Sequence, residues 1–441
     1  MIQHRGKKQG KEGAFYRDLS SFKINLLRQG AWTSFGKVIA SLGTLIGVRL
    51  LTEVVSKEVY GIVSLLLGLM TLGSNLFVAP FMLTAQRLHS EKALAGEVAR
   101  LRYTTVGILR WTVITLVVII LTGGAFYSRY NSMSYLVFPV LSAFLVVQVM
   151  RILETTLFVA ARRQKEAAIW DMAEAWAMPA LAILTVLLVG VCPESILFGY
   201  LIAAGGILFC FFLLPVKGEG KDTTKKIYPP DKRLMKDIWN YAIPLIPLAI
   251  VGWINTLSDR YIIGGLLGTG EVGIYAATYG LIGTPFLIVG STINQTLRPL
   301  YFQTVSAGSK VLEKKILFVW ITITVIVCAF GVMAIYYLRY WIARLLLAEE
   351  YRSGTVLMPW IAAGIGFQVI AQVFEGLLFA YKRTRIILLI HSIGAVVCLL
   401  SVYLMLKQYG LIGAAQACPI YYFTMVILGM LLVQRLRLTS Q

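Results

Sequence analysis

The sequence predicts an all-α polytopic membrane protein with twelve transmembrane helices arranged as two six-helix bundles. Composition is the first indication, because 58% of the residues are hydrophobic and only 14% are charged, far from the usage of soluble domains. The second is that apolar runs of about twenty residues, the length that crosses a bilayer as a helix, recur along the chain. The third is that Lys and Arg alternate from one connection to the next.

The twelve apolar segments follow one another with short connections. They cover residues 31–52, 59–83, 104–126, 134–160, 168–191, 194–216, 238–265, 272–297, 316–338, 353–380, 384–406 and 409–433. Some connections are as brief as CPES at 192–195 and KQYG at 407–410. The longest on the same side, 339–352, predicts a short amphipathic surface helix. Connections of this length leave no room for a soluble catalytic domain.

The distribution of basic residues predicts the orientation. The two tails and every second connection hold 30 of the 41 Lys and Arg residues, the other connections hold 6, and 5 fall inside spans. Because basic connections stay on the cytoplasmic side, both termini should be cytoplasmic and the protein should lie in the inner (plasma) membrane. The net charge of +20 is therefore explained by topology and anionic lipid headgroups, and we expect no nucleic-acid partner.

Composition also predicts the domain organisation. A basic tail, 1–30, precedes the first span without the pattern of a cleavable signal peptide, and its residues 14–29 predict an interfacial helix. A Lys-, Gly- and Pro-containing linker, 217–236, divides the spans into bundles 31–216 and 237–434, and a short tail, 435–441, follows. Because each half has an even number of spans, the halves should form a parallel repeat.

Two stretches support that repeat. Residues 49–61 read RLLTEVVSKEVYG and residues 260–273 read RYIIGGLLGTGEVG. In each, an Arg closes the first span of the half, and Glu-Val leads to a Gly that opens the second span. The alternative is that helical hairpins in general share this pattern of apolar end, glycine turn and apolar start.

No motif for catalysis or for a cofactor is present. The sequence lacks HExxH, GxSxG and P-loop patterns. The five cysteines form no CxxC pair, and the three histidines are scattered, so we expect neither a metal site nor a disulfide framework. His391 has no obvious partner nearby in the sequence.

Charged residues in the outer half of the spans are the first candidates for substrate binding. An ion in the hydrocarbon core costs at least about 2.5–3.5 kcal/mol, so Arg49, Asp259 and Arg260 should face a cavity or a partner. Arg49 and Arg260 occupy matching places in the repeat, and two guanidiniums could grip a phosphate. Alternatively, Arg49 extends to the interface and Asp259 and Arg260 pair with other helices.

Charged residues in the inner half form the second group of candidates. Lys37 and Arg151 add cations, and Glu154 stands three residues after Arg151, where the two could pair. Three carboxylates are candidates for proton or cation coupling, with solvated structural roles as the alternative: Asp171, Glu174 and Glu375. Asp171 and Glu174 share a helical face, so their repulsion should favour protonation of one of them.

Two stretches resemble a known family. VRLLTEVVSKEVYGIVSL at 48–65 and SDRYIIGGLLGTGEVGIYAATYGLI at 258–282 are similar to signatures of the O-antigen-type flippases of the multidrug/oligosaccharidyl-lipid/polysaccharide exporter superfamily. The resemblance implies two six-helix bundles around a V-shaped central cavity. It also implies export of a lipid-linked sugar, with a cationic cavity holding the pyrophosphate. Arg49, Asp259 and Arg260 fall in the matching stretches.

The leading functional hypothesis is therefore a flippase that moves a polyprenyl-pyrophosphate-linked oligosaccharide from the inner to the outer leaflet by alternating access. Its expected partners are that glycan and the bilayer, with a proton or monovalent cation as candidate coupling ion and glycan-assembly proteins as candidate associates. One alternative is a cation-coupled multidrug exporter of the same superfamily. Another is a polytopic glycan-modifying enzyme, which would normally carry a large polar loop or an intramembrane His–Asp constellation.

Overall fold

The predicted fold class is confirmed. A computed structural model describes residues 32, 34–130, 133–213 and 231–439, and these residues form helices joined by short turns, with no strand among them. Twelve helices in this part of the chain are long and apolar enough to cross a membrane. The expected interfacial helix at 14–29 and most of the linker 217–236 lie outside the described residues.

The N-terminal bundle follows the predicted order with one break. Its helices are the first span, Ser34–Val54, then α2 (Lys57–Phe77), α3 (Ala79–Leu94), α4 (Val98–Tyr130), α5 (Val137–Ala160), α6 (Gln164–Val189) and α7 (Pro193–Leu213). The predicted span 59–83 is divided between α2 and α3 at Val78, directly before a helix that has Pro80 in its first turn. A proline in the first turn costs no hydrogen bond, because its missing N–H would have no partner within the helix there.

The C-terminal half differs from prediction at one surface connection. Its elements are α8 (Lys232–Ala242), the 3-10 turn η1 (Ile243–Leu245), α9 (Ile246–Leu267), α10 (Thr269–Ser306), α11 (Lys310–Leu346), the 3-10 helix η2 (Glu349–Val356), α12 (Met358–Ala380), α13 (Thr384–Tyr409) and α14 (Leu411–Thr439). The expected separate helix at 339–352 is absent from the structure. Instead α11 continues to Leu346 and η2 follows, because apolar residues extend the helix beyond the predicted span.

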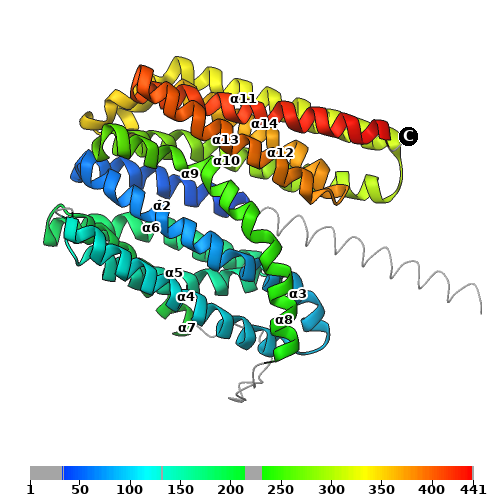
Figure 1. Cartoon of the computed structure of the whole chain (residues 1–441), viewed down its shortest axis with the longest axis horizontal. Coiled ribbons are helices and arrows are strands. Elements are labelled where there is room, and N and C mark those ends of the chain that lie inside the picture. Colours follow the sequence, from blue (N-terminus) through cyan, green and yellow to red (C-terminus); the bar gives the residue numbers. More distant parts are fainter. Residues whose placement is uncertain (1–31, 33, 131–132, 214–230, 440–441) are drawn as a thin grey trace, which may run out of the picture.

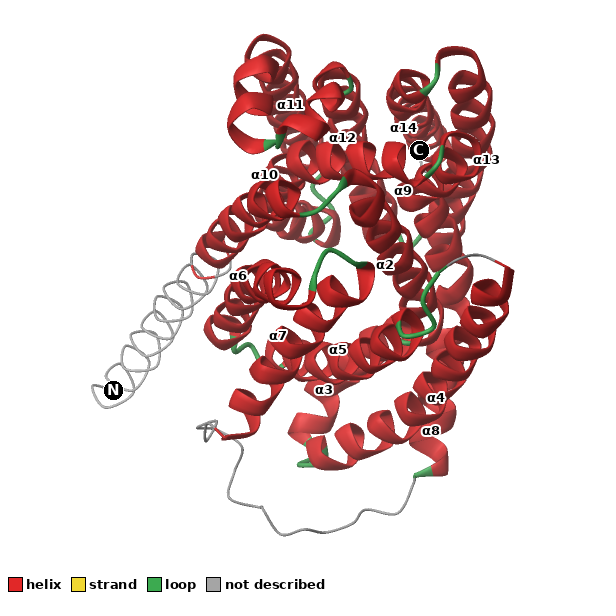
Figure 2. Ribbon diagram, turned by 90° about the vertical axis from the view of Figure 1, so that its left-hand side faces the viewer, coloured by secondary structure: helices red, strands yellow, loops and turns green. Residues whose placement is uncertain are grey.

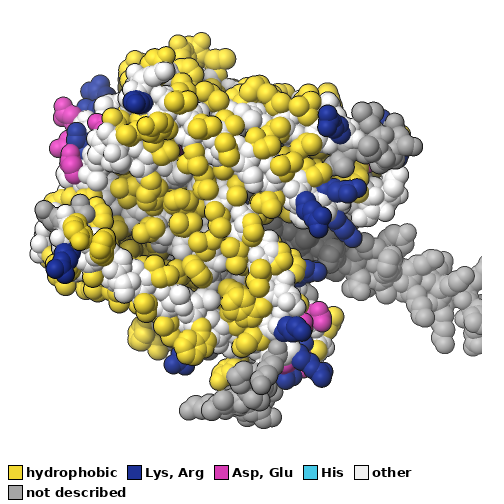
Figure 3. All heavy atoms as spheres, in the orientation of Figure 1, with side chains coloured by type: hydrophobic (Ala, Val, Ile, Leu, Met, Phe, Trp, Pro, Cys, Tyr) yellow, Lys and Arg dark blue, Asp and Glu magenta, His cyan; other side chains and the backbone are white. Residues whose placement is uncertain are grey.

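The two halves of the chain lie side by side (Figure 1). Helices α9 to α14 surround one large apolar core, whereas α2 to α7 share two smaller ones. Hydrophobic side chains cover the broad middle of the face in Figure 3, with charged side chains at its two ends. We call one end the basic end, with the turns at 95–97, 161–163, 307–309 and 381–383, and the other the distal end, with those at 55–56, 190–192, 268, 347–357 and 410.

Helix α8 crosses from one half to the other. It follows the linker in sequence, yet Leu234, Ile238 and Ala242 pack in a core with residues of the N-terminal bundle, and Figures 1 and 2 place α8 beside α3 and α4. The chain then bends at η1, between Pro244 and Pro247, and enters α9. The structure therefore places the start of the expected domain 237–434 on the opposite bundle.

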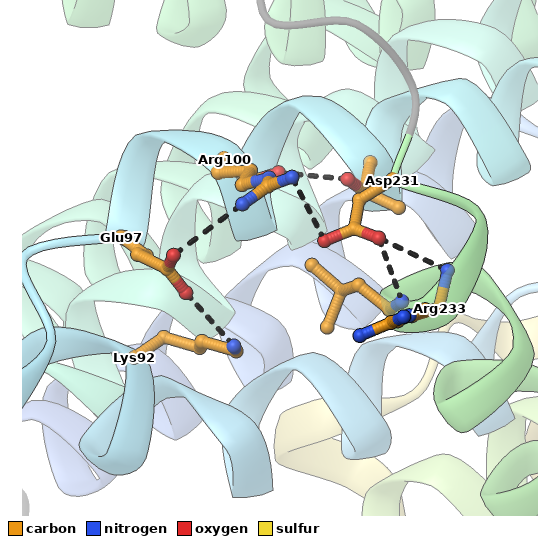
Figure 4. Close-up of polar contacts among 7 residues, drawn as sticks. Lys92, Glu97, Arg100, Asp231 and Arg233 are labelled. Atoms are coloured by element: carbon orange, nitrogen blue, oxygen red, sulfur yellow. Dashed lines mark hydrogen bonds and ion pairs between the residues drawn. The ribbon is translucent and has the colours of Figure 1, made fainter.

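Polar contacts fix the start of α8 to the neighbouring helices (Figure 4). Asp231 accepts hydrogen bonds from the backbone N–H groups of Arg233 and Leu234 and pairs with Arg100 at 3.1 Å. Glu97 pairs with Lys92 at 2.9 Å and with Arg100 at 3.4 Å. The Leu234 N–H lowers the pKa of Asp231, and the hydrogen bond from Lys92 lowers the pKa of Glu97.

Candidate functional site

The two halves meet most closely where α2 crosses α10 near the distal end. A Cβ atom added to Gly61 would lie 1.9 Å from the carbonyl oxygen of Thr269, and one added to Gly273 would lie 2.0 Å from that of Lys57. Gly61 and Gly273 are the two glycines that the internal repeat aligned. The repeat thus brings equivalent backbones into direct contact, as expected at an axis that relates the two bundles.

Hydrogen bonds and ring contacts extend this closure at the distal end. The Tyr351 hydroxyl donates to the carbonyl oxygen of Val55 at 2.8 Å, and its ring lies edge-on to Tyr60 at 5.9 Å between centroids. Deeper along α2, the Tyr261 hydroxyl donates to the Leu65 carbonyl at 2.7 Å. The Trp253 indole donates to the Gly68 carbonyl at 2.9 Å. The distal end is therefore closed by contacts between α2 and the C-terminal half.

Arg260 lies at this interface between the halves. Its guanidinium Nη1 donates to Ser64 Oγ of α2 at 3.0 Å, and its Cζ lies 5.7 Å from the centre of the Tyr279 ring. Its Nε is buried and has no hydrogen-bond partner. Leaving a buried donor of a charged group unpaired is costly, so this nitrogen is available to an acceptor that enters between the halves.

Asp259 points in a different direction from Arg260. Its side chain is 2% exposed, Oδ2 accepts a hydrogen bond from the Tyr275 hydroxyl at 2.6 Å, and Oδ1 accepts one from the Arg260 backbone N–H at 2.8 Å. These contacts lie within the C-terminal bundle. Adjacent helical residues point about 100° apart. Asp259 therefore points into the C-terminal bundle, whereas Arg260 points toward the interface between the halves.

Arg49 forms a local ion pair with Glu53, one helical turn away. Its Nη1 is nevertheless buried without a hydrogen-bond partner. Among the described residues no hydrogen bond or ring contact joins Arg49 to Arg260. Their convergence on one cavity therefore stays a prediction.

A charge cluster around the buried Arg151 joins α5 and α6 in the inner half, with Asp171 at its exposed edge. Arg151 is 7% exposed, and its Nη2 lies 2.6 Å from Glu174 Oε2 and its Nη1 3.7 Å from Asp171 Oδ1. Gln148 donates to Glu174 Oε1 at 2.9 Å. The sequence suggested that Arg151 pairs with Glu154. In the structure Arg151 pairs instead with Asp171 and Glu174 of α6, and Glu154 forms an ion pair with Arg102 of α4.

Lys37 extends this charge cluster toward the other half. Its Nζ donates to Ser291 Oγ of α10 at 3.2 Å, and it is attracted electrostatically to Asp171. A cation from the first span therefore lies between the carboxylates of α6 and the C-terminal bundle.

A second polar group lies inside the C-terminal bundle, where the sequence pointed to Glu375 as a candidate but not to its partner His391. His391 Nε2 is 2.9 Å from Glu375 Oε1, although His391 seemed to lack a partner. The two residues stand at similar distances from the turn 381–383 between α12 and α13, and this hairpin register is the signal that could have found them. Nearby, Asn294 donates to Gln372 at 3.1 Å and accepts from the Trp320 indole at 3.1 Å.

Comparison with known proteins establishes the family. The sequence model of the family described as "Polysaccharide biosynthesis protein" matches residues 26–305. The chain belongs to this family. This member of the family is a multi-pass membrane protein, with twelve helices long and apolar enough to cross a membrane among its described residues. No curated protein matches the chain in sequence.

Solved structures share the fold of this family member. The lipid II flippase MurJ in an inward closed conformation is 14% identical, with a TM-score of 0.66 over 92% of this chain and 87% of that one. An inward-facing multidrug resistance MATE family transporter of the MOP superfamily is 12% identical, with a TM-score of 0.68 over 92% and 96%. A MOP superfamily transporter from Pyrococcus furiosus is 12% identical, with a TM-score of 0.67 over 94% and 96%. At these identities the likeness shows the fold alone.

Proposed function

We propose that this protein is a flippase that moves a polyprenyl-pyrophosphate-linked oligosaccharide from the inner to the outer leaflet by alternating access. The observation that carries the proposal is Arg260, a guanidinium held between the halves with one buried N–H unpaired. A pyrophosphate supplies charged acceptors for such a donor, and Arg offers the planar geometry that matches them. Membership of the polysaccharide biosynthesis family supports a glycan as cargo.

The proposed orientation places the basic end in the cytoplasm and the protein in the inner membrane, with both termini cytoplasmic. The closed distal end then faces outward, so substrate enters from the basic end. Lys37 and Arg151 lie on that side of the distal closure and provide positive charge for the arriving diphosphate, with Glu154 held by Arg102 as their neighbour. Arg260 and Arg49 lie nearer the distal end, where the headgroup would be released.

Asp171, Glu174 and Glu375 remain our candidates for coupling transport to a proton or monovalent cation. Asp171 and Glu174 both lie beside Arg151, so two carboxylates face one guanidinium. A coupling ion that binds there would change the attraction between α5 and α6. Associated glycan-assembly proteins are part of the same proposal.

A cation-coupled multidrug exporter is the second candidate, and the carboxylates around Arg151 together with the shared fold of the MATE transporter favour it. A glycan-modifying enzyme is the third, because His391 and Glu375 form a pair of the kind such an enzyme could use. The family and the structural neighbours are transport or biosynthesis membrane proteins. We therefore assign that pair to transport.

The deciding experiment measures translocation in proteoliposomes that contain purified protein and an undecaprenyl-pyrophosphate-linked oligosaccharide. Movement is read as loss or gain of access for a glycan-cleaving enzyme added outside. We expect the parent protein to speed translocation and a fluorescent cationic drug to be left behind. Drug movement without glycan movement would favour the exporter, and chemical change of the glycan would favour the enzyme.

A further inference from the structure

Arg298 of α10 is a charged residue of a spanning helix that the site described above does not use. Its guanidinium Cζ lies 5.5 Å from the centre of the Phe302 ring and 4.9 Å from that of Phe379 on α12, both within the range of cation–π attraction. Because α12 ends at Ala380, the contact with Phe379 places the guanidinium beside the last turn of that helix, next to the basic end. Aromatic rings of two helices of the C-terminal half therefore hold this cation.

The guanidinium of Arg298 lacks a polar partner. Within the described part of the chain it forms no hydrogen bond and no ion pair. Glu375 attracts it electrostatically, but the Glu375 carboxylate is in contact with His391 Nε2 at 2.9 Å. Two rings orient a guanidinium without satisfying its five N–H donors. The half-buried side chain of Arg298 therefore offers donors to an acceptor that these residues do not supply.

The position of Arg298 along α10 indicates where such an acceptor would lie. Arg298 stands two helical turns after Ser291, so both side chains lie on one face of the helix. Ser291 Oγ accepts a hydrogen bond from Lys37 Nζ of the first span at 3.2 Å. That face of α10 is therefore turned toward the N-terminal half, and Arg298 lies about 10 Å nearer the basic end than the Lys37 contact.

The chemistry of this place fits a phosphate attached to an apolar chain. A guanidinium pairs its N–H groups with phosphate oxygens, and Phe302 and Phe379 give it an apolar surrounding. A polyprenyl diphosphate and an anionic phospholipid both have this chemistry. The diphosphate has a second charged phosphate that a phosphodiester headgroup lacks, and Lys37, two turns deeper on the same face of α10, supplies a second cation for it. The arrangement therefore favours the diphosphate.

We infer that Arg298, positioned by Phe302 and Phe379, is a receiving site for the diphosphate end of the polyprenyl-linked cargo at the basic end. The inference rests on the proposed function and adds a second site to it, because Arg260 lies beyond Lys37, nearer the distal closure. The diphosphate meets Arg298 first and passes Lys37 before it reaches Arg260. Both halves thus contribute a cation to the route.

Binding of farnesyl diphosphate, a short polyprenyl diphosphate, tests the site without transport. Full-length protein with Arg260→Ala, which removes the contribution of Arg260, is placed in phosphatidylcholine nanodiscs, and bound radiolabelled ligand is counted by scintillation proximity. We expect saturable binding that Arg298→Gln weakens by about tenfold to a hundredfold, because it removes hydrogen bonds to a charged group. Arg298→Lys should weaken it less, since it keeps the charge but not the planar fork.

Two further variants complete the binding experiment. Arg344→Gln, an exposed arginine near the distal end of α11, is the matched control and should leave the affinity unchanged. Phe379→Leu keeps an apolar side chain but removes a ring that orients the guanidinium, so it should weaken binding by at least about twofold. Phe379→Leu also tests the site if Arg298→Gln does not fold, and an unchanged affinity in that variant would contradict the positioning by the ring.

Four results would overturn the receiving site. They are absence of saturable binding in the Arg260→Ala protein, equal affinity with and without Arg298→Gln, loss of the Arg298→Gln effect in a Glu375→Gln background, and equal competition by another anion. The third would show that Arg298 acts only as the partner of Glu375. For the fourth, inorganic pyrophosphate and phosphatidylglycerol are the competitors, and we expect each to compete at least about tenfold less well than unlabelled farnesyl diphosphate.

Failure of the receiving site and failure of the proposed function give different results. If farnesyl diphosphate binds equally well with and without Arg298→Gln while the parent protein moves the glycan, the receiving site is refuted and the proposed function stands. If the parent protein does not move the glycan, the proposed function is refuted. The binding measurement then still decides whether Arg298 holds a polyprenyl diphosphate.

Discussion

At the scale of single residues, we expect two neighbours on α9 to have different roles, Arg260 in transport and Asp259 in stability. Arg260 reaches Ser64 across the interface with one N–H unpaired, whereas Asp259 is enclosed with Tyr275. We predict that Arg260→Ala reduces glycan translocation at least about tenfold, since a lost hydrogen bond to a charged group costs about 1.5–3 kcal/mol. Arg260→Lys should restore it only in part, because Lys lacks the planar fork.

The matched control is Arg110→Ala, which removes an exposed arginine from α4. It should leave translocation near the parent rate at equal protein level. Normal translocation by Arg260→Ala would exclude Arg260 from the substrate site. Arg49→Ala should be milder than Arg260→Ala, because Arg49 already has Glu53 as a partner.

For Asp259 we expect a substitution to reduce the stability of the protein. Asp259→Ala removes the acceptor of two buried hydrogen bonds and leaves the Tyr275 hydroxyl unpaired. We predict a loss of about 1.5–3 kcal/mol of stability, seen as a lower thermal midpoint in detergent and less protein in the membrane. Arg260→Ala should keep the parent's midpoint, so equal midpoints in both variants would contradict this division.

At the scale of elements, we expect the close crossing of α2 and α10 to hold the distal end closed. Gly61→Ala places a methyl group 1.9 Å from the Thr269 carbonyl, so the helices must separate. Overpacking of this kind costs about 1–3 kcal/mol, a factor of about five to more than a hundred in the ratio of closed to open distal ends. Ser64→Cys, in a Cys192→Ser background, should then react faster with an impermeant maleimide from outside.

Gly205→Ala is the control for that experiment, because a Cβ at Gly205 meets nothing within 4 Å. It should leave the labelling rate at Ser64→Cys unchanged. An unchanged rate in Gly61→Ala would show that the glycine crossing does not hold the distal end closed.

The docking of α8 gives a second prediction at this scale. Asp231→Ala removes the acceptor for the first N–H groups of α8 and the ion pair with Arg100, so hydrogen exchange at Arg233 and Leu234 should accelerate, whereas Asp237→Ala should not change it. The pKa of Asp231 is lowered in the folded protein. Its contribution is therefore present above the unfolded value, about 3.9, and is lost as pH falls through the lower folded value.

At the scale of the whole molecule, the sequence predicted what depends on local pattern. Hydropathy found the twelve spans, and the aligned glycines Gly61 and Gly273 lie where an axis between two repeats requires them. The predictions that were wrong concerned which residue on another helix a side chain contacts. The spacing of Arg151 and Glu154 allowed a pair, but Asp171 and Glu174 on another helix compete for the same guanidinium.

The position of α8 could not be predicted from the sequence for a similar reason, here for a whole helix and not a single side chain. Its sequence has an apolar face. This pattern predicts that the helix packs against a hydrophobic core, but it does not indicate which of the two bundles provides that core. Only the arrangement of α3 and α4 decides that Ile238 packs in the N-terminal core. Likewise, His391 and Glu375 meet because α12 and α13 pair with a particular register.

Orientation is the whole-molecule property on which the direction of transport depends. The basic turns gather at one end, and positively charged connections stay in the cytoplasm, so reporters fused after Lys226 or Arg383 should read cytoplasmic and those after Ser195 or Lys407 external. An alkaline phosphatase and fluorescent protein pair reports each position with opposite signals. A cytoplasmic reading after Ser195 would reverse the connection between α6 and α7. The closed distal end would then face inward, and the proposed direction of glycan movement would be excluded.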